Sequence, residues 1–339
     1  MRVLVRWALL ALCLACPFAD ADERQERALV RGAVKKAYTS GDYDTLERLH
    51  AQYSDFLHQR TASGASKMGP FMDGLGEGGD ATDALLKRDI ARAERWSQVH
   101  PDSAFGYILH AETLKIYAHF VRGGGYAGSV KAEAWPVFRD YNQRALKVLT
   151  DHLEVASRST SWHAEMIVLG RDEQWEPEAM NGLFEEGIKR DPTDYRLYHY
   201  MVNSLLPKWG GDTRRLDAFI RGVSARAPTA YGMELYARLY SGVEEEQFPG
   251  NLYSDSLADW SLMKAGLRAW VQHFPTAWNT NIFAYHACLA GDKPAARPLF
   301  AEIADHPDPE IWNVDVSPTF DECRRWVAEP TVASASPAD

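Results

Sequence analysis

The sequence predicts an all-α fold in which irregular, tetratricopeptide-like helical hairpins stack as an α-solenoid. Apolar residues recur at helical spacing along the chain and almost nowhere alternate strictly, as they would in a half-buried strand. Two examples are Leu46, Leu49, Tyr53 and Phe56, at i, i+3, i+7 and i+10, and Trp278, Ile282, Tyr285 and Leu289, at i, i+4, i+7 and i+11. Each set forms one apolar stripe along a helix, which a neighbouring helix must cover.

Turn residues divide these helical stretches at repeated intervals. Pro101, Pro192, Pro228, Pro275 and Pro307 each follow a helical run, and proline ends a helix because it lacks an amide hydrogen. Gly-Asp pairs at 41–42, 211–212 and 291–292 mark further turns, with an aspartate placed to cap the next helix. The spacing from Pro192 to Pro228 and from Pro275 to Pro307 is close to the tetratricopeptide period of about 34 residues. Each hairpin of such an array buries its apolar side by stacking on its neighbours.

Residues 1–21 are predicted to be a signal peptide. Arg2 and Arg6 precede an apolar run from Trp7 to Ala15, and Ala19-Asp20-Ala21 matches the small-x-small pattern at which signal peptidase cleaves. The apolar run is too short to span a bilayer, and no later stretch reaches the length of a transmembrane segment. We therefore expect an exported chain, periplasmic or secreted.

The remaining chain divides by its glycine content. Residues 22–63 are predicted to form an N-terminal helical hairpin, and residues 64–81, which contain six glycines, a Gly-rich loop. Residues 82–329 are expected to form the helical-repeat domain. Residues 330–339 have no aromatic anchor and are expected to be a disordered tail.

The cysteines fit an exported protein. Cys13 and Cys16 belong to the signal peptide, which leaves Cys288 and Cys323, an even number in a compartment that permits disulfides. We predict a Cys288–Cys323 disulfide, and the alternative is two buried free thiols. Lipoprotein anchoring through Cys16 is not expected, because Cys13 occupies the lipobox position that leucine usually takes.

The charge balance bears on possible partners. The chain has 37 lysine and arginine residues against 47 aspartate and glutamate residues, a formal net charge of -10, with no long basic stripe. A nucleic-acid partner is therefore not expected, since phosphate backbones bind clustered lysine and arginine. The 11 tryptophans are a high content, and side chains of this size wedge helices together or line grooves.

Three short motifs resemble cofactor or metal sites but lack the required context. Gly123 to Gly128 matches the dinucleotide-binding G-x-G-x-x-G pattern, yet it follows an amphipathic helix and not a strand. His110-Ala111-Glu112 and His163-Ala164-Glu165 match the H-x-E of zinc deaminases, but the sequence has no P-C-x-x-C to supply the cysteine ligands. We therefore expect no cofactor and no metal, and we assign no catalytic residue.

The polar cluster that points most directly to binding is Trp278-Asn279-Thr280-Asn281. Its two side-chain amides lie two positions apart at the start of an otherwise apolar helix, beside aromatic residues. Such a pair can hold the backbone of a peptide on the concave side of a repeat stack, so Trp278, Asn279 and Asn281 are candidate ligand-binding residues. The alternative is an N-cap plus a buried structural amide. Arg238 is a further candidate, as a reader of carboxylates or as a bridge between helices.

Three strings of the sequence resemble a known family. They are Leu205-Leu206-Pro207-Lys208-Trp209-Gly210-Gly211-Asp212, Tyr236-Ala237-Arg238-Leu239-Tyr240, and Trp278-Asn279-Thr280-Asn281-Ile282-Phe283-Ala284 followed by Ala287-Cys288-Leu289-Ala290-Gly291-Asp292. From about Tyr38 to Val327 the chain is similar to the bacterial domain-of-unknown-function family 4034. The resemblance implies irregular tetratricopeptide-like repeats without an established activity, so no catalytic residue is carried over. It also implies the disulfide, because Cys288 and Cys323 fall where the family's recurring cysteines lie.

Two functional hypotheses follow. The first is an exported helical-repeat protein that binds a protein or peptide on an aromatic-lined concave surface, without enzymatic activity. The alternative is an enzyme or small-ligand-binding protein with a pocket between the helix layers, lined by Trp162, His163 and Glu165. A purely structural role is a third interpretation. The sequence identifies no particular partner and no oligomeric state.

Overall fold

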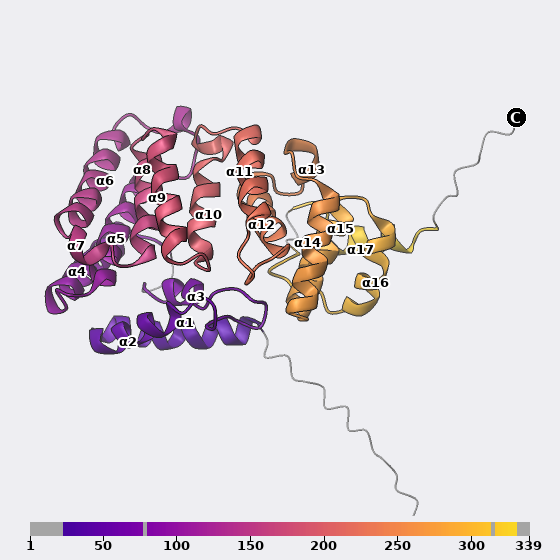
Figure 1. The fold of residues 1–339 in the computed structure, drawn as a ribbon, viewed down its shortest axis with the longest axis horizontal. Coiled ribbons are helices and arrows are strands. Elements are labelled where there is room, and N and C mark those ends of the chain that lie inside the picture. Colours follow the sequence, from indigo (N-terminus) through magenta and orange to yellow (C-terminus); the bar gives the residue numbers. More distant parts are fainter. Residues whose placement is uncertain (1–22, 77–79, 313–315, 331–339) are drawn as a thin grey trace, which may run out of the picture.

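The computed structural model describes residues 23–76, 80–312 and 316–330. Within these ranges the chain forms seventeen α-helices and two short 3₁₀-helices (Figure 1). The same residues contain no strand, and their isolated antiparallel bridge joins Arg60 to Ser66. The all-α prediction is therefore confirmed.

Two of the expected segments, the signal peptide 1–21 and the tail from residue 331, lie outside the described ranges. Among the described residues, no helix is long and apolar enough to cross a membrane.

Residues 104–303 form five successive helix pairs. The first helices of the pairs are α5 (Ala104–Arg122), α8 (Thr160–Asp172), α10 (Tyr195–Ser204), α12 (Glu234–Gln247) and α15 (Ala277–Leu289). The second helices are α6 (Ala134–Asp151), α9 (Pro177–Arg190), α11 (Thr213–Ala225), α14 (Trp260–His273) and α16 (Lys293–Ile303). Short elements lie in the connections: η1 (Ala127–Ser129), α7 (Leu153–Ala156), η2 (Pro207–Trp209) and α13 (Leu252–Asp255).

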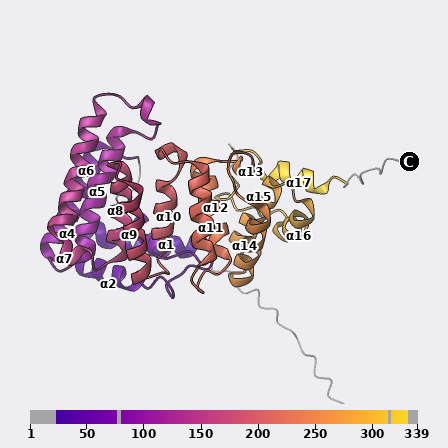
Figure 2. The ribbon, with the colours of Figure 1, turned by 45° about the horizontal axis from the view of Figure 1, so that its top comes forward.

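Each pair packs on the pair before it. α8 contacts both α5 and α6, α10 contacts both α8 and α9, and α12 contacts both α10 and α11. At the two ends of this row, α4 (Asp83–Val99) packs on α5, and α17 (Phe320–Ala328) packs on α15 and α16. Figure 2 shows the pairs following one another from α5 and α6 toward α15 and α16. This order buries the apolar stripes that the sequence places on each helix.

The turn residues lie where the sequence predicts them. All five prolines named above fall between helices. In the pairs at 41–42 and 291–292 the glycine has a φ of 69° or 70°, and the aspartate accepts a hydrogen bond from an amide in the first turn of the next helix. At the third turn the left-handed residue is Gly210, with a φ of 90°, and not Gly211, because Gly210 ends η2 one residue earlier. Asp212 still caps α11.

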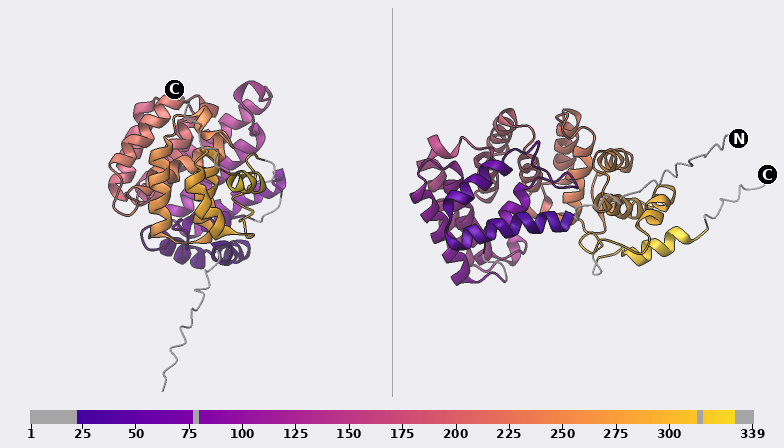
Figure 3. Two further views of the ribbon diagram at one scale, coloured as in Figure 1. Left: turned by 90° about the vertical axis from the view of Figure 1, so that its right-hand side faces the viewer. Right: turned by 90° about the horizontal axis from the view of Figure 1, so that it is seen from below.

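The N-terminal segment, residues 23–76, packs across the stack. It contains α1 (Glu23–Ser40), α2 (Tyr43–Tyr53) and α3 (Met68–Asp73). α1 and α2 lie below the ends of the stacked helices in Figure 1, and the right-hand view of Figure 3 shows α1 crossing beneath them. This segment shares one apolar core with α4 and α5, whose members include Val34, Tyr38, Phe71, Trp96 and Phe105.

The region expected to be a Gly-rich loop differs from that expectation. It contains α3, because Met68 and Phe71 are fully buried and give this stretch an apolar side. Just before it, Thr61 and Ser63 are also buried. This part of the chain is therefore packed into the body of the protein, and the division of the chain into domains stays a prediction.

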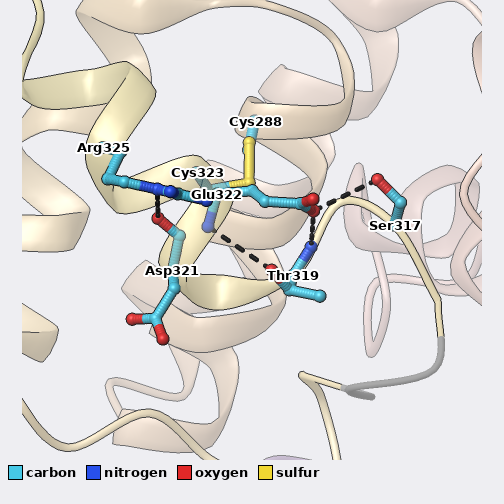
Figure 4. The surroundings of a disulfide bond; sticks show 7 residues. All are labelled: Cys288, Ser317, Thr319, Asp321, Glu322, Cys323 and Arg325. Carbon is cyan, nitrogen blue, oxygen red and sulfur yellow. Dashed lines mark hydrogen bonds between the residues drawn. A yellow bond between two sulfur atoms is a disulfide. The ribbon is translucent and has the colours of Figure 1, made fainter.

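The predicted disulfide is confirmed. Cys288, at the end of α15, is bonded to Cys323 in α17, and their Cα atoms are 5.8 Å apart (Figure 4). α17 begins with a capping box, in which Thr319 and Glu322 exchange side-chain to backbone hydrogen bonds. The covalent bond and the cap together fix the last helix against the final helix pair.

Candidate functional site

We call the side of the first helices against which the N-terminal segment packs the inner face. His50 of this segment stacks on Phe105 of α5 with ring centroids 3.9 Å apart, and Phe56 lies under the guanidinium of Arg196 of α10. Ser63 and Gly64 lie against α12, α14 and α15. The inner-face residues used below are Phe105, Glu112, Ile116, Phe120, Glu165, Arg196, Tyr200, Arg238 and Asn279.

Asn279, a predicted ligand-binding residue, holds the N-terminal segment. Its side chain is 1% exposed, and its Nδ2 donates to the carbonyl of Ser63 at 3.1 Å and to that of Phe274 at 2.8 Å. The indole nitrogen of Trp270 donates to the same Ser63 carbonyl at 2.8 Å. Asn279 thus binds a main-chain carbonyl, as expected for a peptide-binding amide, but the carbonyl belongs to the same chain.

Asn281 is also buried, and it fixes the segment after α16. Its Oδ1 accepts hydrogen bonds from the amide of Asp308 at 3.1 Å and from the indole of Trp312 at 2.8 Å. Its Nδ2 donates to the carbonyl of Ala277 at 2.8 Å. The cap of α15 is Thr276. Asn281 therefore has the geometry of the structural amide that the sequence analysis left open as an alternative.

Arg238 and Trp278 also contact groups of the chain itself. The guanidinium of Arg238 pairs with Glu234 at 2.8 Å and lies 4.0 Å from the centroid of the Trp270 ring. Trp278 is half-buried, and the guanidinium carbon of Arg27 in α1 lies 5.3 Å from its ring centroid. The structure therefore gathers Arg238, Trp278 and Asn279 at one end of the inner face, under the N-terminal segment. Ligand binding by these residues stays a prediction.

The residues of the alternative pocket do not converge. His163 is fully buried and faces α9, where its Nε2 lies 3.6 Å from a carboxylate oxygen of Glu186. Burial lowers the pKa of His163. Glu165 faces α5, as expected for two residues that are two positions apart on one helix. Trp162 is buried, and its indole nitrogen has no hydrogen-bond partner among the described residues.

A cavity of about 290 Å³ lies near the ends of α9, α10 and α11, and none of the predicted site residues lines it. Its lining residues are Ile188, Pro192, Tyr198, Val223, Arg226 and Pro228.

The inner face carries a cluster of ionisable side chains at the middle of α5, α8 and α10. Lys115 of α5 donates to Glu165 of α8 at 2.6 Å, and their side chains are only 10% and 5% exposed. The second carboxylate oxygen of Glu165 is buried without a hydrogen-bond partner in the described part of the chain. A buried carboxylate oxygen without a donor is costly, because it has lost the hydrogen bonds of water.

Glu112 is a second carboxylate of this cluster, and burial changes its pKa. Burial raises its pKa to about 7, the charge of Glu165 adds to this effect, and Lys115 and Arg196 oppose it. Burial also raises the pKa of Tyr200, from the next inner helix, to about 12. In the described ranges Glu112 and the Tyr200 hydroxyl make no hydrogen bond. Glu112 is half-buried as a whole residue and lies one turn before the exposed Ile116 on α5.

An apolar stripe continues past the ionisable cluster. On α5, Glu112, Ile116 and Phe120 follow Phe105 at i+7, i+11 and i+15, which places them on the same side of the helix. Phe105 is covered by His50 and Phe71 of the N-terminal segment. Ile116 and Phe120 are 43% and 41% exposed. The inner face is therefore covered at the start of α5 and open toward its end.

The sequence analysis named Glu165 as a pocket residue but missed the rest of this cluster, although one signal pointed to it. The two H-x-E strings place Glu112 and Glu165 at similar positions in two successive inner helices. As metal motifs, however, the strings draw attention to their histidines, and His163 faces α9, away from this cluster. Lys115 is the clearer signal. A lysine between Leu114 and Ile116 on an apolar helix predicts an anionic partner nearby. Arg196 and Tyr200 carry no comparable signal.

Comparison with known proteins adds no further assignment: no family model, no curated protein and no solved structure matches this chain. The resemblance to the domain-of-unknown-function family 4034 stays a prediction. The fold and the site define an all-α protein of sequential helix pairs with one disulfide and a partly covered inner face.

Proposed function

We propose that this protein is a binding module that takes up a segment of another protein, or a peptide, on the open part of its inner face. One observation supports this proposal above the others. A single stripe of α5 is covered by the chain's own N-terminal segment at Phe105 and left exposed at Ile116 and Phe120. The covered part accommodates helices and an irregular segment, so a partner with similar elements suits the open part.

A crosslinking pull-down with matched variants tests the proposal. The wild-type protein is expected to capture a specific partner, and Phe120→Ser is expected to lose it, because the exposed apolar contact is removed. The control is Leu262→Ser on α14, which is the second helix of its pair. Leu262 is exposed to the same degree as Phe120. Equal capture by both variants would exclude the open stripe as the binding surface. Asn281→Ala is unsuitable here, since that amide is buried.

Small-ligand binding is the second candidate. It is favoured by the Lys115–Glu165 pair and the half-buried Glu112, which place polar groups in an otherwise apolar surface. Under this hypothesis the variants at Phe120 and Leu262 behave alike in a pull-down, and a small molecule binds with an affinity that depends on Glu112.

The proposal includes a tetratricopeptide-like α-solenoid as the architecture and an exported location. The solenoid is supported by the packing of α8, α10 and α12, each of which contacts both helices of the preceding pair. Export is supported by the Cys288–Cys323 disulfide, since such bonds persist in oxidising compartments. N-terminal sequencing of the protein from fractionated cells tests export, and a chain that keeps Met1 in the cytoplasm would contradict it.

A further inference from the structure

We propose that the open part of the inner face recognises a basic side chain, lysine or arginine, which its partner inserts between Glu112 and Glu165. This inference rests on the proposed binding function and names the chemistry of the partner. The groups that carry it come from three successive inner helices. They are Glu112 and Lys115 of α5, Glu165 of α8, and Arg196 and Tyr200 of α10.

The hydrogen bonds of the cluster leave acceptors unused. Lys115 binds one oxygen of Glu165, and the other oxygen is buried without a donor. Arg196 is held by Asp194 and Ser161, so its charge is already balanced. Glu112 has no hydrogen-bond donor among the described residues. An incoming ammonium or guanidinium group has N–H donors for these oxygens.

The charges point the same way. With Glu112 ionised, Glu112, Glu165 and Lys115 sum to one negative charge, while Arg196 and Asp194 cancel. The charged or titratable groups that face Glu112 are Lys115, Glu165, Arg196 and Tyr200. Lys115 is paired with Glu165 and Arg196 with Asp194, so no cation remains to pair with Glu112. A basic side chain supplies one, and the chain's net charge of -10 favours the approach of such a partner.

The neighbouring apolar residues fit the rest of such a side chain. Ile116 and Phe120 follow Glu112 at i+4 and i+8 and are exposed. The methylene stem of a lysine or arginine can pack on these two residues while its charged end reaches Glu112. We therefore expect the partner to carry an apolar residue next to its basic one.

Isothermal titration calorimetry with two capped tripeptides tests this inference. One peptide has lysine between two leucines, and the matched control has glutamine in place of the lysine. The lysine peptide is expected to bind, and to bind about tenfold more tightly at pH 8 than at pH 6, because Glu112 loses its proton near pH 7. Glu112→Gln is expected to weaken binding and to remove the pH dependence, whereas Glu154→Gln, an exposed carboxylate on α7, changes neither.

A second measurement uses the wild-type protein alone. Carbon-13 NMR of the Glu112 carboxyl group is expected to show a lower pKa when the lysine peptide is bound than when the protein is free. Equal binding of the two peptides, or tighter binding at pH 6, would overturn the inference. Tighter binding at pH 6 would indicate that protonated Glu112 donates a hydrogen bond to a carbonyl of the peptide and does not pair with its lysine.

The outcomes separate this inference from the proposed function. If a protein partner is captured through Phe120 but capture is unaffected by Glu112→Gln, the binding function stands and the basic-residue inference fails. If the lysine peptide binds with the expected pH dependence but no protein is captured, the recognition chemistry stands and the partner class fails. If neither binds, both are wrong.

Discussion

The covered and the open parts of the inner face differ in whether their polar groups find partners within the chain. At the covered part, Asn279 and Trp270 bind the carbonyl of Ser63, and Arg238 pairs with Glu234. At the open part, Glu112 and one oxygen of Glu165 have no donor among the described residues. The comparison shows that polar residues in an apolar surface stabilise the fold where other groups of the chain form hydrogen bonds or ion pairs with them. Those that the fold leaves without partners are the candidates for binding.

The largest effect on stability is expected from the Lys115–Glu165 pair. Lys115→Met leaves the Glu165 carboxylate buried without its counter-charge, so we expect the free energy of unfolding to fall by about 3 to 5 kcal/mol. Urea denaturation measures it. The control is the double variant Lys115→Met with Glu165→Met, which removes both charges and should recover most of the loss. A single variant as stable as wild type would contradict the buried ion pair.

A smaller loss is expected from Asn281→Ala in α15. The substitution leaves the amide of Asp308 and the indole of Trp312 without an acceptor, which should cost about 2 to 4 kcal/mol. Thermal and urea unfolding both report it. Asn279→Ala is the matched comparison, because Ser63 keeps its bond from Trp270 there and the cost should be lower. If Asn281→Ala is as stable as wild type, Asn281 lacks the structural role described above.

Gly64→Ala tests how tightly the N-terminal segment lies on the stack. Gly64 has a φ of 80°, and an added methyl group would meet the ring of Phe274 at 2.5 Å. The strain and the clash together should cost about 2 kcal/mol. Gly76→Ala is a control, since nothing lies within 4 Å of the added carbon there. Equal stability of the two variants would show that this end of the inner face is loosely covered.

Glu112 contributes a pH dependence to stability, which unfolding at two pH values can measure. The pKa of this group is raised in the folded protein, so its unfavourable contribution is absent below about pH 4.5 and complete above about pH 7. Glu112→Gln should therefore be more stable than wild type at pH 8, by about 3 kcal/mol, and equally stable at pH 4. The difference between the two unfolding curves isolates Glu112, because both proteins share the acid-sensitive buried histidines. A constant difference across this range would contradict the raised pKa.

Local features of this molecule follow from the sequence, and long-range ones do not. The helical spacing predicts the helices, proline and Gly-Asp pairs predict the turns, and the count of cysteines predicts the Cys288–Cys323 bond. The contact of Ser63 with Asn279 joins positions 216 residues apart, and no spacing rule reaches that far. The glycines from Gly64 onward predict a loop, although Phe71 gives this stretch an apolar side.

The candidate site shows the same limit. Periodicity places Glu112 on the same side of α5 as Phe105, but the partner of Lys115 lies on a different helix. The sequence marks Asn279 and Asn281 as unusual residues in an apolar helix, and the structure places both in the interior. A polar residue in an apolar stripe therefore indicates that its side chain needs a hydrogen-bond partner. Only the fold shows whether that partner belongs to the chain itself or to another molecule.

The disulfide between α15 and α17 determines how the two ends of this molecule lose their structure. In a row of helix pairs an end unit has one neighbour, so ends open more often than the middle. The first helices are covered by the N-terminal segment, whereas the last helix is held by a covalent bond. Reducing that bond leaves α17 held only by noncovalent contacts, such as those of Phe320 with Phe300 and Trp312, while the other end is unchanged. The redox state of the surroundings thus selects the end from which hydrogen exchange and proteolysis begin.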